Sequence, residues 1–239
     1  MIINNNIDIS IYNASVSSKL IQPRNIEIEA GNIKENYFLI NEKEEMKVIT
    51  INILFQGKTR DEVYKNISDF MVNFRNEVDI KFNNLSHNYK CYLVDSSIDE
   101  TDLEEWLYLN LSLKGYEYGD IISHAIKGNG MHSTNNMYTF PIKNKGNLKS
   151  PCILEIVPTI DMIDFTIEGL SDQPIIINNL KKNSKIVIDS FNGSVTAGND
   201  NKFNDVDMWE FPAISPGVNN IMLSRNECSV IINYYPRFM

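Results

Sequence analysis

The stretch that decides the fold is "NILFQGKTRDEVYKNI", Asn52 to Ile67. It continues an alternating apolar pattern in which Ile51, Ile53 and Phe55 fall on one face, as expected for a β-strand. Gly57-Lys58-Thr59 then ends the strand, and apolar residues at helical spacing follow. A strand, a GKT sequence and a helix in this order are also the layout of a nucleotide-binding P-loop, so the stretch offers two interpretations.

The spacing of the glycines excludes the P-loop. The motif places a first glycine five residues before the second, and counting back from Gly57 this position holds Asn52. The residues that should wrap the phosphates already belong to the strand. In the structural interpretation Gly57 turns the chain, Thr59 caps the helix and Glu62 completes a capping box. We therefore predict a structural helix from Thr59 to about Arg75. Its apolar stripe comprises Val63, Ile67, Phe70, Met71 and Phe74.

Composition indicates an ordinary globular chain. Of its 239 residues, 43% are hydrophobic and 22% charged, which fits one large or two modest domains. No stretch has the apolar length needed to span a bilayer, so we expect no membrane insertion. The first residues, MIINNN, lack the basic and apolar regions of a secretory signal. We therefore expect the protein to stay in the cytoplasm where it is made, or to leave as part of something larger.

The net charge of −9 is concentrated in the first half of the chain. Residues 1–120 carry 20 acidic and 12 basic side chains, whereas residues 121–239 carry 11 and 10. Affinity for nucleic acid comes largely from Lys and Arg, so an acidic chain without a basic stripe predicts no specific nucleic-acid binding. An acidic surface can instead repel DNA.

No residue pattern indicates catalysis or a metal site. Cys91, Cys152 and Cys228 are widely spaced and include no CxxC pair, which argues against disulfides and zinc. The acidic run 99–105 is typical of a solvated face, and the oxygen-rich stretch 198–207 lacks the spacing of an EF-hand. No Gly-x-Ser-x-Gly elbow occurs. We therefore expect no enzyme, no cofactor and no bound metal.

The two halves differ in their predicted elements. The first combines alternating strands with the single helix, while the second contains short strands separated by turn signals and no helix, which favours a sandwich or jelly roll. Asn192-Gly193 predicts a two-residue type I′ hairpin. Residues 127–136, KGNGMHSTNN, are small and polar, as in a connector. We predict domains at 1–126 and 141–239, joined by a connector at 127–140.

Several motifs of the first half stand in a recognisable order. They are Ile51-x-Ile53-x-Phe55-x-Gly57-x-Thr59-x-Asp61-Glu62-Val63 with its helix, Tyr89-x-Cys91-x-Leu93, and the strand Trp106–Gly115 followed by Tyr116-x-Tyr118-Gly119. This order resembles the N-terminal domain of phage distal tail (Dit) proteins.

The second half carries a more specific set of motifs. They are Gly146-Asn147, Ser150-Pro151-Cys152-Ile153-Leu154-Glu155-Ile156-x-Pro158, Ile167-x-Gly169-Leu170, Ile186-Val187-Ile188-Asp189, Trp209-Glu210-Phe211-Pro212, Ser215-Pro216-Gly217-x-Asn219 and the terminal Tyr235-Pro236-Arg237-Phe238-Met239. Their order is similar to the galectin-like C-terminal domain of the same family.

The resemblance implies a mainly β fold: an N-terminal β-barrel-like domain with one α-helix, followed by a C-terminal galectin-like jelly-roll β-sandwich. It also implies a homo-hexameric ring in the virion tail, at the tip of a phage tail or a phage-tail-like particle. In that family picture the N-terminal domains surround the channel and join the tail-tube protein to the tail-associated hub protein. The C-terminal domains project outward and hold receptor-binding or other baseplate proteins. We further expect part of the acidic surplus of residues 1–120 to face the channel.

A carbohydrate-binding module for recognition of the host surface is the alternative function, because jelly-roll sandwiches commonly bind sugars. Trp209, Tyr234 and Tyr235 are the candidates for stacking on a sugar ring. All three fit a sandwich core or edge equally well.

Overall fold

A computed structural model describes residues 1–23, 26–33, 36–44, 46–127, 131–132 and 137–239. The chain forms two compact units, Met1–Tyr118 and Gly119–Phe238. We call them the first and the second unit.

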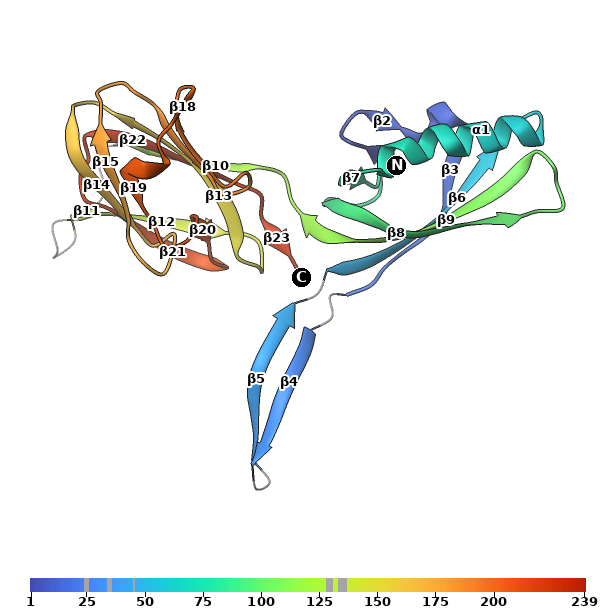
Figure 1. Ribbon diagram of the computed structural model, residues 1–239, viewed down its shortest axis with the longest axis horizontal. Coiled ribbons are helices and arrows are strands. Elements are labelled where there is room, and N and C mark those ends of the chain that lie inside the picture. The colour runs from blue at the N-terminus through green and yellow to red at the C-terminus, as the bar shows by residue number, and fades with distance from the viewer. Residues whose placement is uncertain (24–25, 34–35, 45, 128–130, 133–136) are drawn as a thin grey trace. The chain divides into compact units, whose positions relative to one another are not determined.

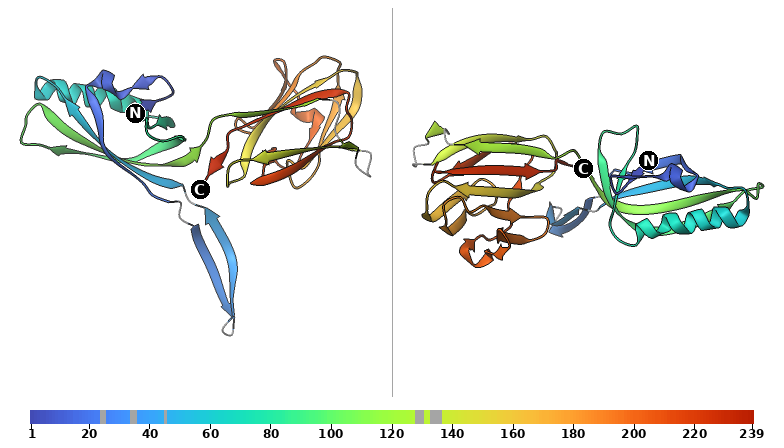
Figure 2. Two further views of the ribbon diagram at one scale, coloured as in Figure 1. Left: turned by 180° about the vertical axis from the view of Figure 1, so that it is seen from behind. Right: turned by 90° about the horizontal axis from the view of Figure 1, so that it is seen from above.

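The first unit is built from an antiparallel sheet in the strand order β2-β1-β7-β8-β9-β6-β3, with α1 lying along one face (Figure 1). The two views of Figure 2 show the same arrangement from behind and from above. A separate hairpin pairs β4 with β5. The elements are β1 (Ile2–Ile3), β2 (Ile7–Asp8), η1 (Ile9–Tyr12), β3 (Ala14–Ile21), β4 (Ile26–Ile33), β5 (Asn36–Glu44), β6 (Lys47–Gln56), α1 (Arg60–Met71), η2 (Val72–Phe74), β7 (Val78–Lys81), β8 (Asn88–Glu100) and β9 (Trp106–Tyr118).

Alternation along the central strands places their large apolar side chains under α1. On β6 these are Ile49, Ile51, Ile53 and Phe55, and on β9 they are Leu107, Leu109, Leu111 and Leu113; each is at most 1% exposed. The helix contributes Val63, Ile67 and Phe70 to the same core. The rings of Phe55 and Phe70 meet edge to face, with their centroids 5.3 Å apart. Apolar side chains recur every second residue in the strands and about every 3.6 residues in the helix, so the strands and the helix each turn one apolar face to the same core.

The second unit consists of two antiparallel sheets, in the orders β10-β22-β13-β16-β17-β18 and β11-β12-β21-β14-β15-β19. Its elements are β10 (Ile122–Lys127), β11 (Met131–His132), β12 (Tyr138–Asn144), β13 (Ser150–Pro158), β14 (Met162–Glu168), β15 (Ile175–Leu180), β16 (Ile186–Asp189), β17 (Ser194–Ala197), β18 (Asp200–Asn201), η3 (Phe203–Asp205), β19 (Val206–Asp207), β20 (Ala213–Ile214), β21 (Gly217–Leu223), β22 (Cys228–Tyr234) and β23 (Arg237–Phe238).

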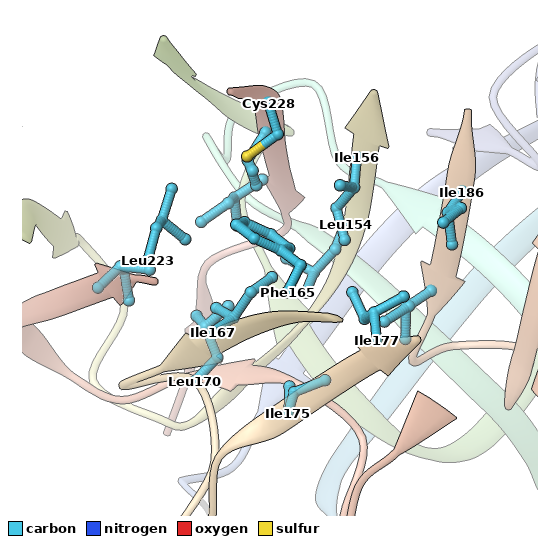
Figure 3. Close-up of a cluster of buried hydrophobic side chains, with 14 of the residues drawn as sticks. Leu154, Ile156, Phe165, Ile167, Leu170, Ile175, Ile177, Ile186, Leu223 and Cys228 are labelled. Carbon is cyan, nitrogen blue, oxygen red and sulfur yellow. The ribbon is translucent and has the colours of Figure 1, made fainter. Parts of the chain in front are cut away.

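The core of the second unit lies between these sheets. Leu154 and Ile156 of β13 meet Phe165 and Ile167 of β14 in one buried cluster (Figure 3). Cys152 and Cys228 are buried there as free thiols, and burial raises the pKa of Cys228 to about 12. The mainly β fold with a single α-helix among the described residues is confirmed. The galectin-like character of the second unit remains a prediction.

The boundary between the units lies earlier in the chain than the sequence suggests. The strand β10 pairs with β22 along its whole length, so residues 119–126 belong to the second unit and not to the first. Residues 138–140 of the predicted connector belong to β12. Residues 128–130 and 133–136 of that connector lie outside the described residues.

The turn at Asn192-Gly193 is not a two-residue type I′ hairpin. The paired residues Asp189 and Ser194 enclose a four-residue loop, in which Gly193 has φ +63 but Asn192 has no positive φ. The carboxylate of Asp189 accepts hydrogen bonds from the backbone N–H groups of Phe191 (2.8 Å) and Asn192 (3.2 Å). This local side-chain contact stabilises the longer loop.

Candidate functional site

The start of α1 shows how Gly57-Lys58-Thr59 folds. Thr59 is the N-cap residue, with extended φ −142 and ψ 157, and its Oγ1 accepts a hydrogen bond from the N–H of Glu62 at 3.3 Å. In return, Glu62 Oε2 accepts from the N–H of Lys58 at 2.8 Å, one residue before the partner of a standard capping box. The strand β6 runs to Gln56, so no residues remain for a phosphate-binding loop.

Replacing Thr59 with alanine is expected to lower the free energy of unfolding by about 1 kcal/mol, because one N–H at the helix start loses its acceptor. Urea denaturation of the variant and the parent protein measures the difference. A Thr59→Ser variant keeps the hydroxyl and should retain most of the stability. Equal loss in both variants would contradict the role of the hydroxyl as cap.

Four strands of the first unit form a block, with one register shift in β3 between Val16 and Ser18 and one in β8 between Leu93 and Asp95. The strand β3 (residues 14–21) pairs with residues 49–55 of β6. The same part of β6 pairs with residues 107–113 of β9, which in turn pair with residues 93–100 of β8. Because α1 covers the face with the large apolar residues, the alternate side chains lie on the opposite face. These form three rows: Ser15, Leu54, Tyr108 and Asp99; Ser18, Asn52, Asn110 and Ser97; and Leu20, Thr50, Ser112 and Asp95. We call these rows the polar face.

Hydrogen bonds between side chains cross the polar face. Asn52 Nδ2 donates to Asn110 Oδ1 at 2.6 Å, and Asn110 Nδ2 donates to Asp99 Oδ2 at 2.7 Å. Two carboxylates but no Lys or Arg occur in the three rows. These three rows are therefore hydrated and weakly acidic, and they offer no cation to a phosphate backbone.

Both lateral edges of this block are open. On one side, β3 pairs with β6 alone among the described strands. A groove of about 530 Å³ runs beside it, lined by residues 14–19 of β3 and, across the gap, by Met1, Asp8, Ile9 and residues 82–84. The side chain of Lys19 crosses this groove and donates a hydrogen bond to Asn84 Oδ1. On the other side, β7 pairs only with Asn88–Cys91 of β8. The outer edge of residues 93–100 has no partner among the described strands, and Val94 and Ile98 on it are 56% and 39% exposed. Unpaired strand edges are sites for pairing with another chain.

A buried ion cluster stabilises one end of the sheet. Lys47 of β6 forms a salt bridge with Glu117 of β9, and their side chains are only 8% and 14% exposed. His87 Nδ1 lies 2.6 Å from the other carboxylate oxygen. Burial raises the pKa of Glu117, but the hydrogen bonds from Lys47 and His87 outweigh it, so this pKa lies below its ordinary value.

The depressed pKa of Glu117 predicts a pH dependence of stability. A carboxyl with a lowered folded-state pKa stabilises the fold fully above its unfolded pKa, near 4.5. That contribution disappears as the pH falls through the folded pKa. The difference in unfolding free energy between the parent protein and Glu117→Gln should therefore shrink as the pH falls from 6 to about 3. Urea midpoints across this range measure it, and a constant difference would contradict the assignment.

The aromatic residues considered for sugar stacking lie in three different environments. Tyr234 is fully buried and donates its hydroxyl to the carbonyl of Lys143 at 3.1 Å, so its assignment to a sugar site is corrected: it is a core residue. Tyr235 is half-buried and packs edge to face on Phe191, with the ring centroids 5.8 Å apart. Only Trp209 is freely accessible, at 89% exposed.

The described residues contain no group of three or more His, Cys, Asp or Glu side chains arranged to hold a metal ion. In the oxygen-rich stretch 198–207, Asp205 instead pairs with Lys202, whose Nζ lies 2.8 Å from the carboxylate. Within the same described residues, no helix has both the length and the apolar character needed to cross a membrane.

Comparison with known proteins is most specific for the second unit. Residues 145–238 match the family model described as siphovirus-type tail component, C-terminal domain. The match covers most of the second unit, which therefore resembles the C-terminal domain of this tail-component family. The resemblance to phage distal tail proteins is thereby confirmed. A search of the curated proteins found no match.

Solved structures extend the likeness to the whole chain. The Dit protein of phage SPP1, described as a paradigm of the hub adsorption apparatus in phages that infect Gram-positive hosts, aligns with a TM-score of 0.78 at 11% identity. The alignment covers 100% of both chains. Chains from the phage p2 baseplate in its activated conformation align with TM-scores of 0.54 with Sr and 0.53 with Ca, at 12% and 13% identity. Each covers 95% of this chain and 92% of the other. At such identities the likeness shows that both units share the Dit fold.

Sequence reasoning did not find the open edges or the polar face of the Dit-like first unit. The alternation of Thr50 and Asn52 with large apolar residues, and of Asn110 and Ser112 with leucines, was the available signal for the polar face. The open edges had no signal in the sequence, because pairing partners are distant in the chain.

Proposed function

We propose that this protein is a structural subunit of the phage tail tip, and that six copies form a distal-tail ring between the tail tube and the baseplate hub. The tail-component family of the second unit and the Dit fold of the whole chain support this role. The first unit forms the ring, and the second unit is the attachment platform for other baseplate or receptor-binding proteins. The role is structural and involves no catalytic step.

The observation that carries the ring is the pair of open edges in the four-strand block. Across the block each strand is antiparallel to its neighbour, in the order β3, β6, β9, β8. The two outer strands, β3 and β8, therefore run in opposite directions. Rotation about an axis parallel to the strands preserves strand direction. The β3 edge of one copy can therefore continue the antiparallel sheet beyond the β8 edge of the next. A head-to-tail joint of this kind closes into a ring when the rotation allows it.

In such a ring α1 lies outside the sheet and the polar face lines the channel. Small hydroxyl and amide side chains with Asp95 and Asp99 keep this wall hydrated. The three rows contain no Lys or Arg and so do not hold DNA phosphates, while the next row along this face adds the single ammonium group of Lys114. This agrees with the expected acidic lining of the channel. A ring structure in which Lys or Arg dominates the channel wall would contradict this part of the proposal.

Disulfide trapping tests the proposed joint. Ser18→Cys on β3 is combined in turn with Asp95→Cys, Ser97→Cys or Asp99→Cys on β8, because the register between copies is not fixed in advance. Within one copy Ser18 and Ser97 are three strand spacings apart, about 14 Å, which is too far for a disulfide. The native cysteines are buried. Under oxidising conditions one combination should give a ladder of covalent species up to the hexamer, which collapses on reduction.

The single-cysteine variants are the matched controls, since each can form at most a dimer. Negative-stain electron microscopy over a range of concentrations shows separately whether rings with a central hole form. Rings without a ladder in any combination would contradict the β3–β8 joint but not the ring. Single particles that stay single when mixed with tail-tube and hub proteins would contradict the ring itself.

A further inference from the structure

Trp209 presents an almost wholly exposed indole on a fixed loop of the second unit. Its side chain is 89% exposed, although tryptophan is usually buried to a large extent because its surface is mostly apolar. The flanking residues Met208 and Phe211 pack against the core. Behind the loop, the carbonyl of Pro212 accepts a hydrogen bond from Ser190 Oγ at 2.6 Å. The backbone therefore holds Trp209 in place while its ring meets the solvent.

The charged side chain that follows Trp209 in the chain is also held in place. Glu210, the next residue, accepts a hydrogen bond from the N–H of Asp172 at 2.9 Å. Lys149 Nζ lies 3.2 Å from its other carboxylate oxygen. The hydrogen bonds from the backbone of Asp172 and from Lys149 hold the pKa of Glu210 below its ordinary value. Three loops thus bring a carboxylate and an ammonium group together at the residue that follows the exposed Trp209.

We propose that Trp209, Glu210 and Lys149 form a binding site for a pyranose saccharide. One face of a pyranose ring carries C–H groups and can stack on the flat indole, while its hydroxyls donate to a carboxylate and accept from an ammonium group. The side chains of Glu210 and Lys149 are 35% and 47% exposed, so both are accessible to hydroxyls. A protein partner would favour a larger apolar centre depleted of charge, whereas Asp207 and Glu210 flank Trp209 in the chain and the backbone of Asp172 contacts Glu210. This binding activity goes beyond the structural role proposed above.

Trp209 fluorescence in the full chain tests the site. The chain contains two tryptophans, so Trp106→Phe leaves Trp209 as the reporter. The probes are glucose, galactose, rhamnose, N-acetylglucosamine and N-acetylgalactosamine, with their di- and trisaccharides. At least one should change the emission of Trp209 saturably, with a Kd on the order of 1 mM or tighter.

Calorimetric titration of that saccharide into variants assigns the contacts. Trp209→Ala should weaken binding at least tenfold, and Glu210→Gln and Lys149→Met should each weaken it severalfold. Ile163→Ala is the matched control, because Ile163 is another exposed hydrophobic residue of the same unit, at 83%, and binding should not change. The proposal is overturned if no probe alters Trp209 emission, or if Trp209→Ala binds as tightly as the parent protein. Neither result depends on ring formation.

Discussion

Glu117→Gln is expected to lower the free energy of unfolding of the first unit by about 3 kcal/mol, because it leaves the buried ammonium of Lys47 without its counter-charge. The two side chains are only 8% and 14% exposed, so water compensates little for the lost partner. They come from positions 70 residues apart and tie the start of β6 to the end of β9. Isosteric glutamine keeps the shape of the site, so the measured loss reflects charge.

The same unit contains a matched control for this effect. Lys90 and Glu77 also form a Lys–Glu pair, 3.0 Å apart, but their side chains are 32% and 34% exposed. Glu77→Gln should therefore cost less than about 1 kcal/mol, since water and salt screen the exposed pair. The two units can unfold separately, so a Trp209→Phe background is used, in which Trp106 on β9 reports on the first unit. Equal losses in the two variants would show that burial does not decide the effect.

Gly115→Ala is expected to lower the unfolding free energy of the first unit by about 3 kcal/mol, because β8 approaches β9 too closely for a methyl group. A Cβ on Gly115 would lie 2.2 Å from the carbonyl oxygen of Lys90 and 2.8 Å from the Cα of Cys91. Both are backbone atoms of the paired strand, so the methyl group can be accommodated only if the sheet shifts. Nothing flexible can yield in their place.

Gly119→Ala provides the comparison for this substitution. A Cβ there would meet Phe238 at 3.4 Å and Pro236 at 3.8 Å, which are ordinary contact distances. Urea denaturation followed by circular dichroism, which reports on both units, should show a large fall in midpoint for Gly115→Ala and little change for Gly119→Ala. A stable Gly115→Ala protein would mean that β8 and β9 lie farther apart than the structure indicates.

Much of the fold could be predicted because it depends on short repeating patterns. Ile51, Ile53 and Phe55 alternate as a strand whatever lies beside them, and Val63, Ile67 and Phe70 share one helix face for the same local reason. The mainly β content of both halves and the resemblance to the distal tail family were likewise readable from patterns along the chain. The candidate site was less predictable, since only the amphipathic alternation of its strands was visible.

What the sequence by itself determined is thus the type of each major element and the face that each one buries. The tertiary structure alone decided which strand edges stay open, that Tyr234 is buried while Trp209 is exposed, and that Lys47 meets Glu117. It also decided that β10 pairs with β22 and so belongs to the second unit. The physical reason is the distance along the chain over which each kind of interaction acts. Propensity, periodicity and capping act over a few residues, whereas strand pairing, burial and buried ion pairs depend on contacts between residues many tens of positions apart.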